Sequence, residues 1–334
     1  MFPDMSATAA QPPLIPAGRH PIETQRYVLP TPAIVALHDA VDQWTANRVP
    51  GAVIVGRPRL GKTRAIFYVT QWLAQAASPL PVVHWRCYEH KSPAEGVFFE
   101  DLLRASGHAL VRSGTPSAKR DRLVQWLWEK AHRAGDNRLL LFADDAQRLA
   151  GQHYQWLMDI YNDLDAEGVS LITLLVGQQE LKHQRSAFLT AGQRQIVGRF
   201  MTHIHQFYGV RTEDDLTECL ESYDTATEFP VGSGWSFPQY FCPVRFAAGW
   251  RLKEEAGTLW EVFARLRRAH AIPSDLDIPM QYVTWTVEYL LKQERSLEPM
   301  ATWNEGLMEA AIRHSGYLDA EALWTSPPTD ARDK

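Results

Sequence analysis

The residues best suited to chemistry form one short run between positions 56 and 63. Its letters, Gly-Arg-Pro-Arg-Leu-Gly-Lys-Thr, match the GxxxxGK[ST] pattern of a phosphate-binding loop. Glycines let such a loop fold tightly and direct backbone N–H groups at phosphate oxygens, at the N-terminus of the following helix. Lys62 would reach the β- and γ-phosphates of ATP, and the Thr63 hydroxyl would ligate Mg²⁺. The predicted nucleotide contacts in the loop are Gly56, Pro58, Arg59, Leu60, Gly61, Lys62 and Thr63.

A pair of carboxylates, Asp144 and Asp145, follows the apolar run at residues 139–143. Beside a phosphate-binding loop, Asp144 would hold the magnesium through its water shell and Asp145 would polarise the attacking water. An aspartate at this place can also cap the next helix, and both roles can hold at once. Hydrolytic relatives usually carry Glu as the second carboxylate. Because Asp is one methylene shorter, we expect slow hydrolysis of ATP.

These residues must be positioned by strands, and the sequence predicts a strand before each of them. Residues 52–55 are a β-branched apolar run that ends at a glycine, which is typical of a strand buried on both faces. Further strands are expected at residues 82–87, 139–143, 169–176 and 203–208. Helical patterns are expected at residues 34–44, 63–77, 98–110, 120–134 and 145–165. Strands separated by helices imply an α/β fold with a parallel, doubly wound sheet.

The chain is expected to have four segments. Residues 1–25 should be a flexible arm, because their prolines and small residues give no periodic apolar face. Residues 26–224 should form the α/β ATPase core. Residues 225–295 should form a small helical lid with an aromatic, Gly/Pro-rich insertion, and residues 296–334 a C-terminal helix and polar tail.

The composition of the 334 residues is that of an ordinary globular protein, with 45% hydrophobic and 22% charged residues. A net charge of -5 excludes a uniformly basic surface for nucleic acid, but not a local basic stripe. The three cysteines are far apart and lack CxxC spacing, so we expect neither a disulfide frame nor a zinc site. No apolar stretch approaches the ~18 residues of a spanning helix and no signal peptide is evident, so a cytoplasmic location is expected.

The segment from about residue 27 to residue 210 resembles an AAA+ ATPase. It has, in order, an N-terminal helix, a Walker A strand, a Walker B strand, a strand that ends in a polar residue, and a helix that ends in arginine. The resemblance implies that Gln178, which follows the apolar strand, is the sensor 1 residue that orients water near the γ-phosphate. A helix-capping or solvent-facing glutamine is the alternative.

The same resemblance implies that Arg199, in the run Gly-Arg-Phe, is an arginine finger for the ATP of a neighbouring subunit. Arg194 is the competing choice, and a plain surface arginine is the alternative to both. A finger that acts between subunits requires a head-to-tail interface, hence a ring or a helical filament. No Gly-x-x-Arg pattern marks a sensor 2 residue; the two arginines that could serve are Arg245 and Arg251.

Two motifs are similar to the TnsC/TniB family, the ATP-dependent regulators of target selection in Tns-type transposons. They are the Walker B run Ala-Asp-Asp-Ala-Gln-Arg-Leu and the strand end Val-Gly-Gln-Gln-Glu-Leu. Residues 233–252 resemble the TnsC proteins of CRISPR-associated transposons. The resemblance implies homo-oligomers, rings or filaments, that assemble with ATP on double-stranded DNA. They would connect a target-selection protein such as TniQ to the transposase.

In that family the DNA runs through a central channel, contacted by loops and helices after the second strand. The corresponding basic residues are Lys91, Lys119 and Arg120. Their contacts would be to phosphates, with weak sequence preference and strong salt dependence. Solvated surface charges are the alternative. The aromatic residues between positions 235 and 250 are expected to be lid core or a subunit contact rather than a platform for bases.

Two other functions fit parts of the sequence. A helicase loader or IstB-like helper ATPase would have a similar core and would deliver another enzyme to DNA. A P-loop kinase for a small molecule would need a compact chain with a substrate pocket, and it would not need Arg199 or the long helical C-terminal part. Assembly on DNA with ATP would exclude the kinase.

Overall fold

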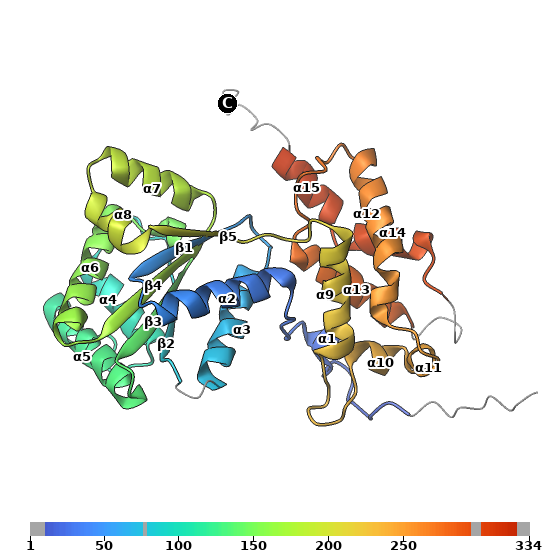
Figure 1. Ribbon diagram of the computed structural model, residues 1–334, viewed down its shortest axis with the longest axis horizontal. Helices are drawn as coiled ribbons and strands as arrows, with labels where there is room; N and C mark the ends of the chain where they lie inside the picture. The colour runs from blue at the N-terminus through green and yellow to red at the C-terminus, as the bar shows by residue number, and fades with distance from the viewer. Residues whose placement is uncertain (1–10, 76–78, 295–301, 326–334) are drawn as a thin grey trace, which may run out of the picture. The chain divides into compact units, whose positions relative to one another are not determined.

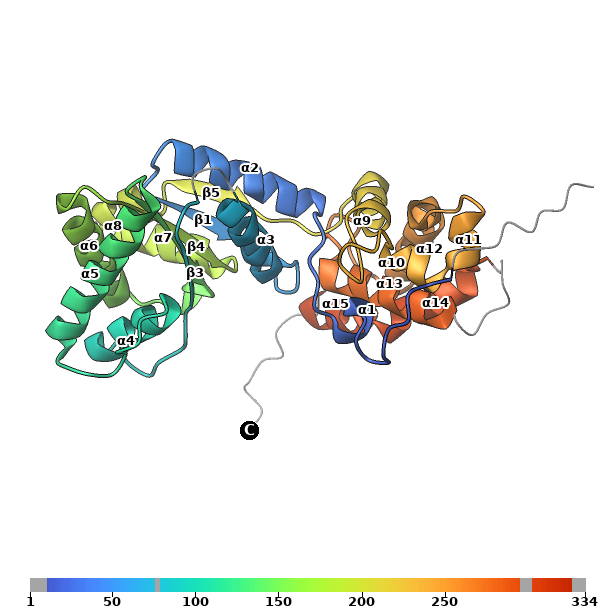
Figure 2. The same ribbon diagram turned by 90° about the horizontal axis from the view of Figure 1, so that it is seen from below.

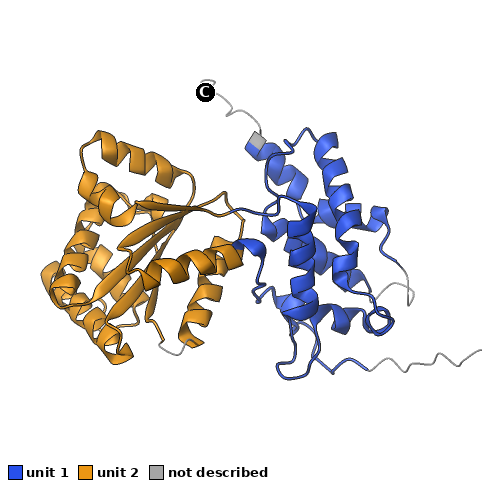
Figure 3. Ribbon diagram, viewed as in Figure 1, with its two compact units in different colours: residues 1–33, 208–334 blue, residues 34–207 orange. Residues whose placement is uncertain are grey.

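The computed structural model describes residues 11–75, 79–294 and 302–325. The chain divides into two compact units, residues 34–207 and residues 1–33 with 208–334 (Figure 3). Parts of the predicted arm and tail, residues 1–10, 295–301 and 326–334, lie outside the described residues, as does the end of the helix predicted to reach residue 77. None of the described helices is both long and apolar enough to cross a membrane.

Unit 34–207 is built on a five-stranded sheet with the strand order β2-β3-β4-β1-β5 (Figure 1). All four strand pairs are parallel, which confirms the predicted fold class. The strands are β1 Gly51–Val55, β2 Val82–Arg86, β3 Arg138–Asp144, β4 Ser170–Gly177 and β5 His203–Gln206. The helices α2 Pro32–Ala46, α3 Lys62–Gln75, α4 Glu95–Ala105, α5 Pro116–Ala134, α6 Gly151–Ala166, α7 Glu180–Thr190 and α8 Arg194–Phe200 surround the sheet (Figures 1 and 2).

The central strands are buried almost throughout, whereas β2 and β5 are the two outer strands of the sheet and are partly exposed. This burial explains why the central strands are continuous apolar runs without alternation. The carboxyl ends of β1, β3 and β4 meet at one edge of the sheet, because the register pairs Val55 with Gly177 and Asp144 with Val176. The predicted loop follows β1, Asp144 is the last residue of β3 and Asp145 comes next, so the fold brings the loop and the carboxylates together.

The region after β3 differs from the single helix predicted from residue 145 onward. Asp145 has φ 60° and ψ 36°, in the left-handed region. A short 3₁₀ helix, η1 Ala146–Arg148, follows, and α6 begins only at Gly151. Asp is one of the few residues other than Gly that enter the left-handed region readily. The backbone therefore turns sharply at the second carboxylate.

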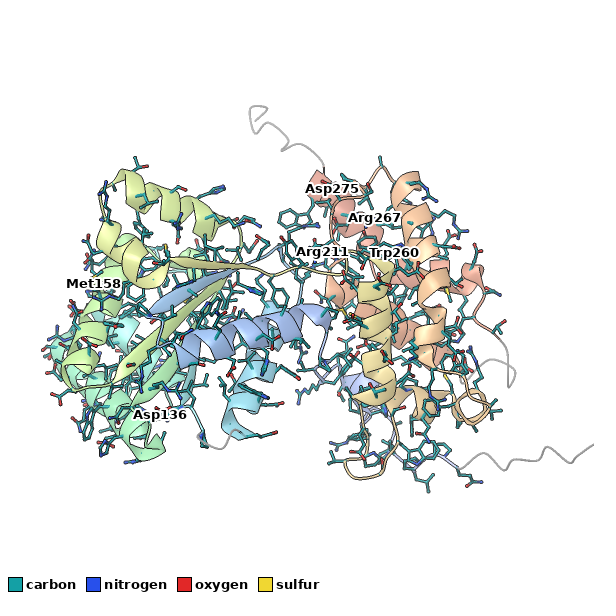
Figure 4. The ribbon with its side chains drawn as sticks, in the orientation of Figure 1. Asp136, Met158, Arg211, Trp260, Arg267 and Asp275 are labelled. Atoms are coloured by element: carbon teal, nitrogen blue, oxygen red, sulfur yellow. The ribbon has the colours of Figure 1, made fainter. Side chains whose placement is uncertain are left out.

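The other unit is helical. Its elements are α1 Pro21–Thr24, α9 Glu213–Thr225, α10 Phe237–Phe241, α11 Pro243–Ala247, η2 Leu252–Glu255, α12 Ala256–Ala269, α13 Met280–Glu294, α14 Glu305–His314 and α15 Tyr317–Thr325. Phe237 and Phe241 lie in its core, as expected for packed lid residues. Arg267 of α12 is buried and donates hydrogen bonds to the carbonyls of Pro273 and Leu276, which holds the loop after α12 in place (Figure 4).

The borders of this unit differ from the predicted segments. Ile22, predicted to lie in a flexible arm, is fully buried in the helical core together with Leu29. Leu216 and Leu220 of α9 pack in the same core, so residues 208–224 belong to the helical unit rather than to the α/β core. Neither difference is visible in local periodicity, because both depend on which core the apolar side chains enter.

Candidate nucleotide site

The loop between β1 and α3 depends on glycine at two positions, for different reasons. A Cβ at Gly56 would lie 2.6 Å from the carbonyl oxygen of Phe207 and 2.9 Å from Leu60 Cδ1, so position 56 has no room for a side chain. Gly61 has open space but a φ of +106°, which L side chains rarely adopt. Leu60 itself is buried and anchors the loop. Pro58 is partly buried and Arg59 is exposed, with a φ of 65°.

Lys62 folds back over this loop. Its Nζ donates hydrogen bonds to the carbonyl oxygens of Gly56, at 2.8 Å, and of Arg57, at 2.7 Å. The ammonium therefore lies against the loop that is predicted to hold the phosphates. A phosphate bound there would give the cation an anionic partner in place of neutral carbonyls.

Thr63 and Asp144, the two predicted magnesium residues, are in direct contact. The Thr63 hydroxyl donates a hydrogen bond to Asp144 Oδ2 at 2.9 Å, although the residues are 81 positions apart in the sequence. A hydroxyl and a carboxylate are hard oxygen ligands, which fit the preference of Mg²⁺ for one or two protein oxygens together with water and phosphate. The donor set present at this edge of the sheet therefore fits the ion.

His84 on β2 was not among the predicted site residues. Its Nε2 lies 3.3 Å from the same Asp144 Oδ2 that Thr63 contacts. Burial by itself raises the pKa of Asp144, but the hydrogen bonds from His84 and Thr63 outweigh it, and the pKa is lowered from the ordinary value of 3.8. Asp144 is thus ionised at neutral pH. A polar residue inside the apolar run of β2 is the sequence signal that could have indicated His84.

Asp145 is held by its neighbours in η1. Its main-chain N–H donates to Asp144 Oδ1 at 3.1 Å, and its Oδ1 accepts a hydrogen bond from Gln147 Nε2 at 3.3 Å. Its other oxygen lies 3.9 Å from a guanidinium nitrogen of Arg148. The side chains of the two carboxylates therefore have separate partners. Asp145 is partly exposed, so water can reach its carboxylate.

Gln178 is the first residue after β4 and is partly buried. Its main-chain N–H donates to Gln147 Oε1 at 3.3 Å, so a single side chain contacts both Asp145 and Gln178. The structure thus brings the predicted water-polarising and sensor residues to the same place. Gln147 was not among the predicted site residues.

The candidate arginine finger lies on α8. The guanidinium carbon of Arg199 is 3.9 Å from the centre of the Tyr161 ring, and its Nη1 donates to Asn162 Oδ1 at 3.4 Å. Arg194, the competing residue, is exposed at the start of the same helix. Within one chain, Arg199 therefore packs against α6. Its action on the ATP of a neighbouring subunit stays a prediction.

The two arginines considered for sensor 2 have structural contacts within the helical unit. Arg245 is buried and pairs with Glu255 at 2.7 Å and with Glu294 at 3.5 Å. Arg251 donates to the carbonyls of Phe246 and Trp250. Both arginines therefore have partners within the helical unit.

The predicted DNA contacts separate into two groups. Lys91 is exposed in the loop between β2 and α4, and Arg120 on α5 is partly exposed. Lys119 is only 7% exposed, and its Nζ forms an ion pair with Glu100 Oε1 at 2.5 Å. A phosphate could reach this ammonium only if the ion pair between α4 and α5 broke. We therefore correct the assignment of Lys119 from a DNA contact to a structural residue.

Comparison with known proteins gives a domain and a fold. Residues 50–184 match the profile of the AAA domain. No curated protein sequence matches the chain. The ORC2 protein of Aeropyrum pernix, solved in ADPNP and ADP complexes, is similar with a TM-score of 0.50 and 15% identity, over 88% of this chain and 71% of that one. The AAA match and this similarity show the AAA+ fold.

Two further solved structures have lower scores. Domain III of the Thermotoga maritima replication initiation protein DnaA has a TM-score of 0.47 and 15% identity, over 92% of this chain and 99% of that one. The Aeropyrum pernix ORC1 protein in complex with DNA has a TM-score of 0.41 and 13% identity, over 85% of this chain and 83% of that one.

Proposed function

We propose that this chain is an ATPase that assembles with ATP on double-stranded DNA. The match of residues 50–184 to an AAA domain and the AAA+ fold support the ATPase part of this proposal. The hydrogen bond between Thr63 and Asp144 carries the proposal. It joins the end of the phosphate-binding loop to the carboxylate of the last residue of β3, which is the pairing that a Mg-nucleotide site requires. The nucleotides bound to the ORC2 protein of similar fold support ATP as the ligand.

In this proposal each side chain at the sheet edge has a defined task. Lys62 would bind the β- and γ-phosphates, and Thr63 and Asp144 would hold Mg²⁺. The bound ion neutralises charge on the phosphates. Asp145 accepts a hydrogen bond from the attacking water and Gln178 orients it. The short side chain of Asp145 makes hydrolysis slow, which suits a switch better than a motor.

Assembly and DNA binding rest on basic residues away from the loop. Arg199 would act on the ATP of the next subunit, so full activity would appear only in the oligomer. Lys91 and Arg120 would contact phosphates of the DNA. Because the net charge of the chain is -5, basic residues must be gathered at the surface that meets the DNA phosphates.

The finer proposal is a regulator of transposition of the TnsC/TniB type, which links a target-selection protein such as TniQ to the transposase. The similarity of residues 143–149, 176–181 and 233–252 to that family supports it. A helper ATPase that delivers a helicase would share the same core. Capture of a transposase or of a helicase by the ATP-bound oligomer would distinguish the two.

The first test is assembly on a double-stranded DNA fragment with ATP, imaged by negative-stain electron microscopy. Wild type should form rings or filaments, whereas Lys62→Ala should fail to bind ATP and Arg199→Ala should fail to assemble or to hydrolyse ATP. Arg133→Ala is the matched control, because Arg133 is exposed on α5, where it pairs with Glu129 at the surface and lies 6.0 Å from the centre of the Trp126 ring. A wild-type chain that stays monomeric with ATP and DNA would refute the proposed function.

A further inference from the structure

The side-chain amide of Gln147 is bound at both of its ends. Nε2 donates to the Asp145 carboxylate at 3.3 Å, and Oε1 accepts from the main-chain N–H of Gln178 at 3.3 Å. An amide is a neutral side-chain group that combines such a donor and acceptor in one plane. Gln147 therefore spans the ends of the neighbouring strands β3 and β4, where Asp145 and Gln178 are found.

The backbone of Gln147 is fixed as well. Gln184 of α7 donates from its Nε2 to the Gln147 carbonyl at 2.8 Å and to the Leu149 carbonyl at 3.2 Å. The fully buried Tyr154 donates in turn to Gln184 Oε1 at 3.2 Å. This chain of hydrogen bonds anchors η1 to α6 and α7, so the amide of Gln147 projects from a rigid support.

Gly177, the last residue of β4, adjoins this contact. A Cβ at this position would overlap Gln147 Oε1 and would lie 2.7 Å from Leu181 Cδ1. The φ of Gly177 lies outside the left-handed region, so its conformation does not require glycine, and the two atoms that a Cβ would meet are ends of side chains that can shift. Glycine at this position lets the Gln147 amide reach the N–H of Gln178 without such a shift.

We propose that Gln147 is a positioning residue for ATP hydrolysis, whose amide holds the Asp145 carboxylate in a fixed relation to Gln178. The inference rests on the ATPase part of the proposed function and adds a residue to it. In hydrolysis the water oxygen bonds to the γ-phosphorus while the bond to the bridging oxygen breaks, and its electron pair stays with ADP. Asp145 receives the hydrogen bond from the water, and the proton leaves with the released phosphate. Gln147 fixes where that carboxylate stands.

The first variant is Gln147→Ala. Lys62 donates to the carbonyls of Gly56 and Arg57, and Thr63 donates to Asp144, so removal of the Gln147 amide should change ATP affinity and KM by less than about twofold. Misplacement of a catalytic group by about 1 Å can reduce the rate on the order of 100-fold, so kcat should fall about 10- to 100-fold. Gln152→Ala is the matched control, because Gln152 is an exposed glutamine five positions along in α6. It should keep wild-type kcat and KM.

The second variant, Gln147→Glu, has the same shape but a different polarity. It keeps an acceptor for the N–H of Gln178 and loses the donor to Asp145, where it places a second negative charge. A positioning role therefore predicts a loss of kcat at least as large as in Gln147→Ala. If Gln147 served only as the acceptor for the N–H of Gln178 at the end of β4, Gln147→Glu should have near wild-type activity.

The third measurement is a double-mutant cycle with Asp145→Asn. If Gln147 acts through the Asp145 carboxylate, adding Gln147→Ala to Asp145→Asn should lower kcat by less than about twofold further. Full additivity in the cycle would overturn the inference, as would a Gln147→Glu enzyme of wild-type kcat. Loss of ATP binding in Gln147→Ala, measured with a fluorescent ATP analogue, would also overturn it.

The ATPase assay is run with and without DNA, which separates this inference from the proposed function. A wild-type chain that hydrolyses ATP but does not assemble on DNA refutes the DNA function, while the Gln147 variants are still decided by their kcat. Wild type that assembles and hydrolyses, with Gln147→Ala unchanged, refutes only the inference. Absence of hydrolysis in wild type under both conditions overturns the inference.

Discussion

Replacement of Lys119 by alanine is predicted to destabilise the sheet-containing unit and to leave DNA binding unchanged. Nζ of Lys119 lies 2.5 Å from Glu100 Oε1, and the side chains are 9% and 22% exposed. Breaking a buried ion pair by removing one partner costs about 3–5 kcal/mol, because the remaining charge has no partner. Water reaches part of Glu100, which reduces the expected loss to about 2 kcal/mol.

The assay is urea unfolding followed by tryptophan fluorescence. With an m-value of about 2 kcal/mol per molar urea, the midpoint should fall by about 1 M in Lys119→Ala. The double variant Lys119→Met/Glu100→Leu should recover most of the loss, because it removes both charges and keeps apolar volume. DNA affinity is measured in parallel as a function of salt concentration, under conditions where each variant is folded.

Lys91→Ala is the contrasting variant, since Lys91 is exposed. It should leave the urea midpoint unchanged and should reduce the slope of log affinity against log salt by about 1 if Lys91 contacts a phosphate. The reasoning about Lys119 would be refuted by the opposite pattern, a wild-type urea midpoint together with a reduced salt slope in Lys119→Ala.

Three more predictions concern single residues. Gly56→Ala should lose binding of a fluorescent ATP analogue, because the new Cβ would lie 2.6 Å from the Phe207 carbonyl oxygen. Retained affinity for the analogue would show that the loop does not need this close approach of Gly56 to Phe207. Tyr161→Leu removes the ring 3.9 Å from Arg199 and should lower the ATPase rate of the oligomer only a few-fold. Arg199→Ala should abolish the stimulation of ATPase activity by assembly. Equal effects of the two variants would mean that Arg199 acts only through its packing on α6. Burial raises the pKa of Asp224 above 3.8, although two backbone N–H groups that donate to it lower the pKa. Folding therefore favours its protonated form, and its contribution to stability grows as pH falls through the folded pKa toward 3.8. Urea unfolding of Asp224→Asn between pH 7 and pH 4 should lack this part of the pH dependence, and an unchanged pH profile would argue against it.

Local sequence pattern was enough to predict the sheet and the residues around the phosphate-binding loop. The β-branched and apolar runs that form β1, β3 and β4 are continuous because both faces of a parallel sheet are covered. The pattern GxxxxGK[ST] identifies its own loop, since its glycines are required by a clash at position 56 and by backbone conformation at position 61. Motifs of this kind carry their information within a few adjacent residues.

The pattern failed where a residue's role depends on a distant partner. Lys119 looks like any basic residue near the start of a helix, and only the packing of α4 on α5 brings Glu100 to its ammonium. Ile22 looks like part of a loose arm until the helical unit is assembled around it. Burial of these side chains is decided by contacts between segments, about which local periodicity contains no information.

The sequence by itself determined the five strands, most of the helices around the sheet, the GxxxxGK[ST] loop and the pair of carboxylates at the end of β3. Tertiary structure alone decided that His84 joins Thr63 at Asp144, and that the Gln147 amide spans from Asp145 to Gln178. The reason is the strand order β2-β3-β4-β1-β5, which places residues from four separate segments at one edge of the sheet. Strand order results from how the helices pack between strands, so no short stretch of sequence specifies it.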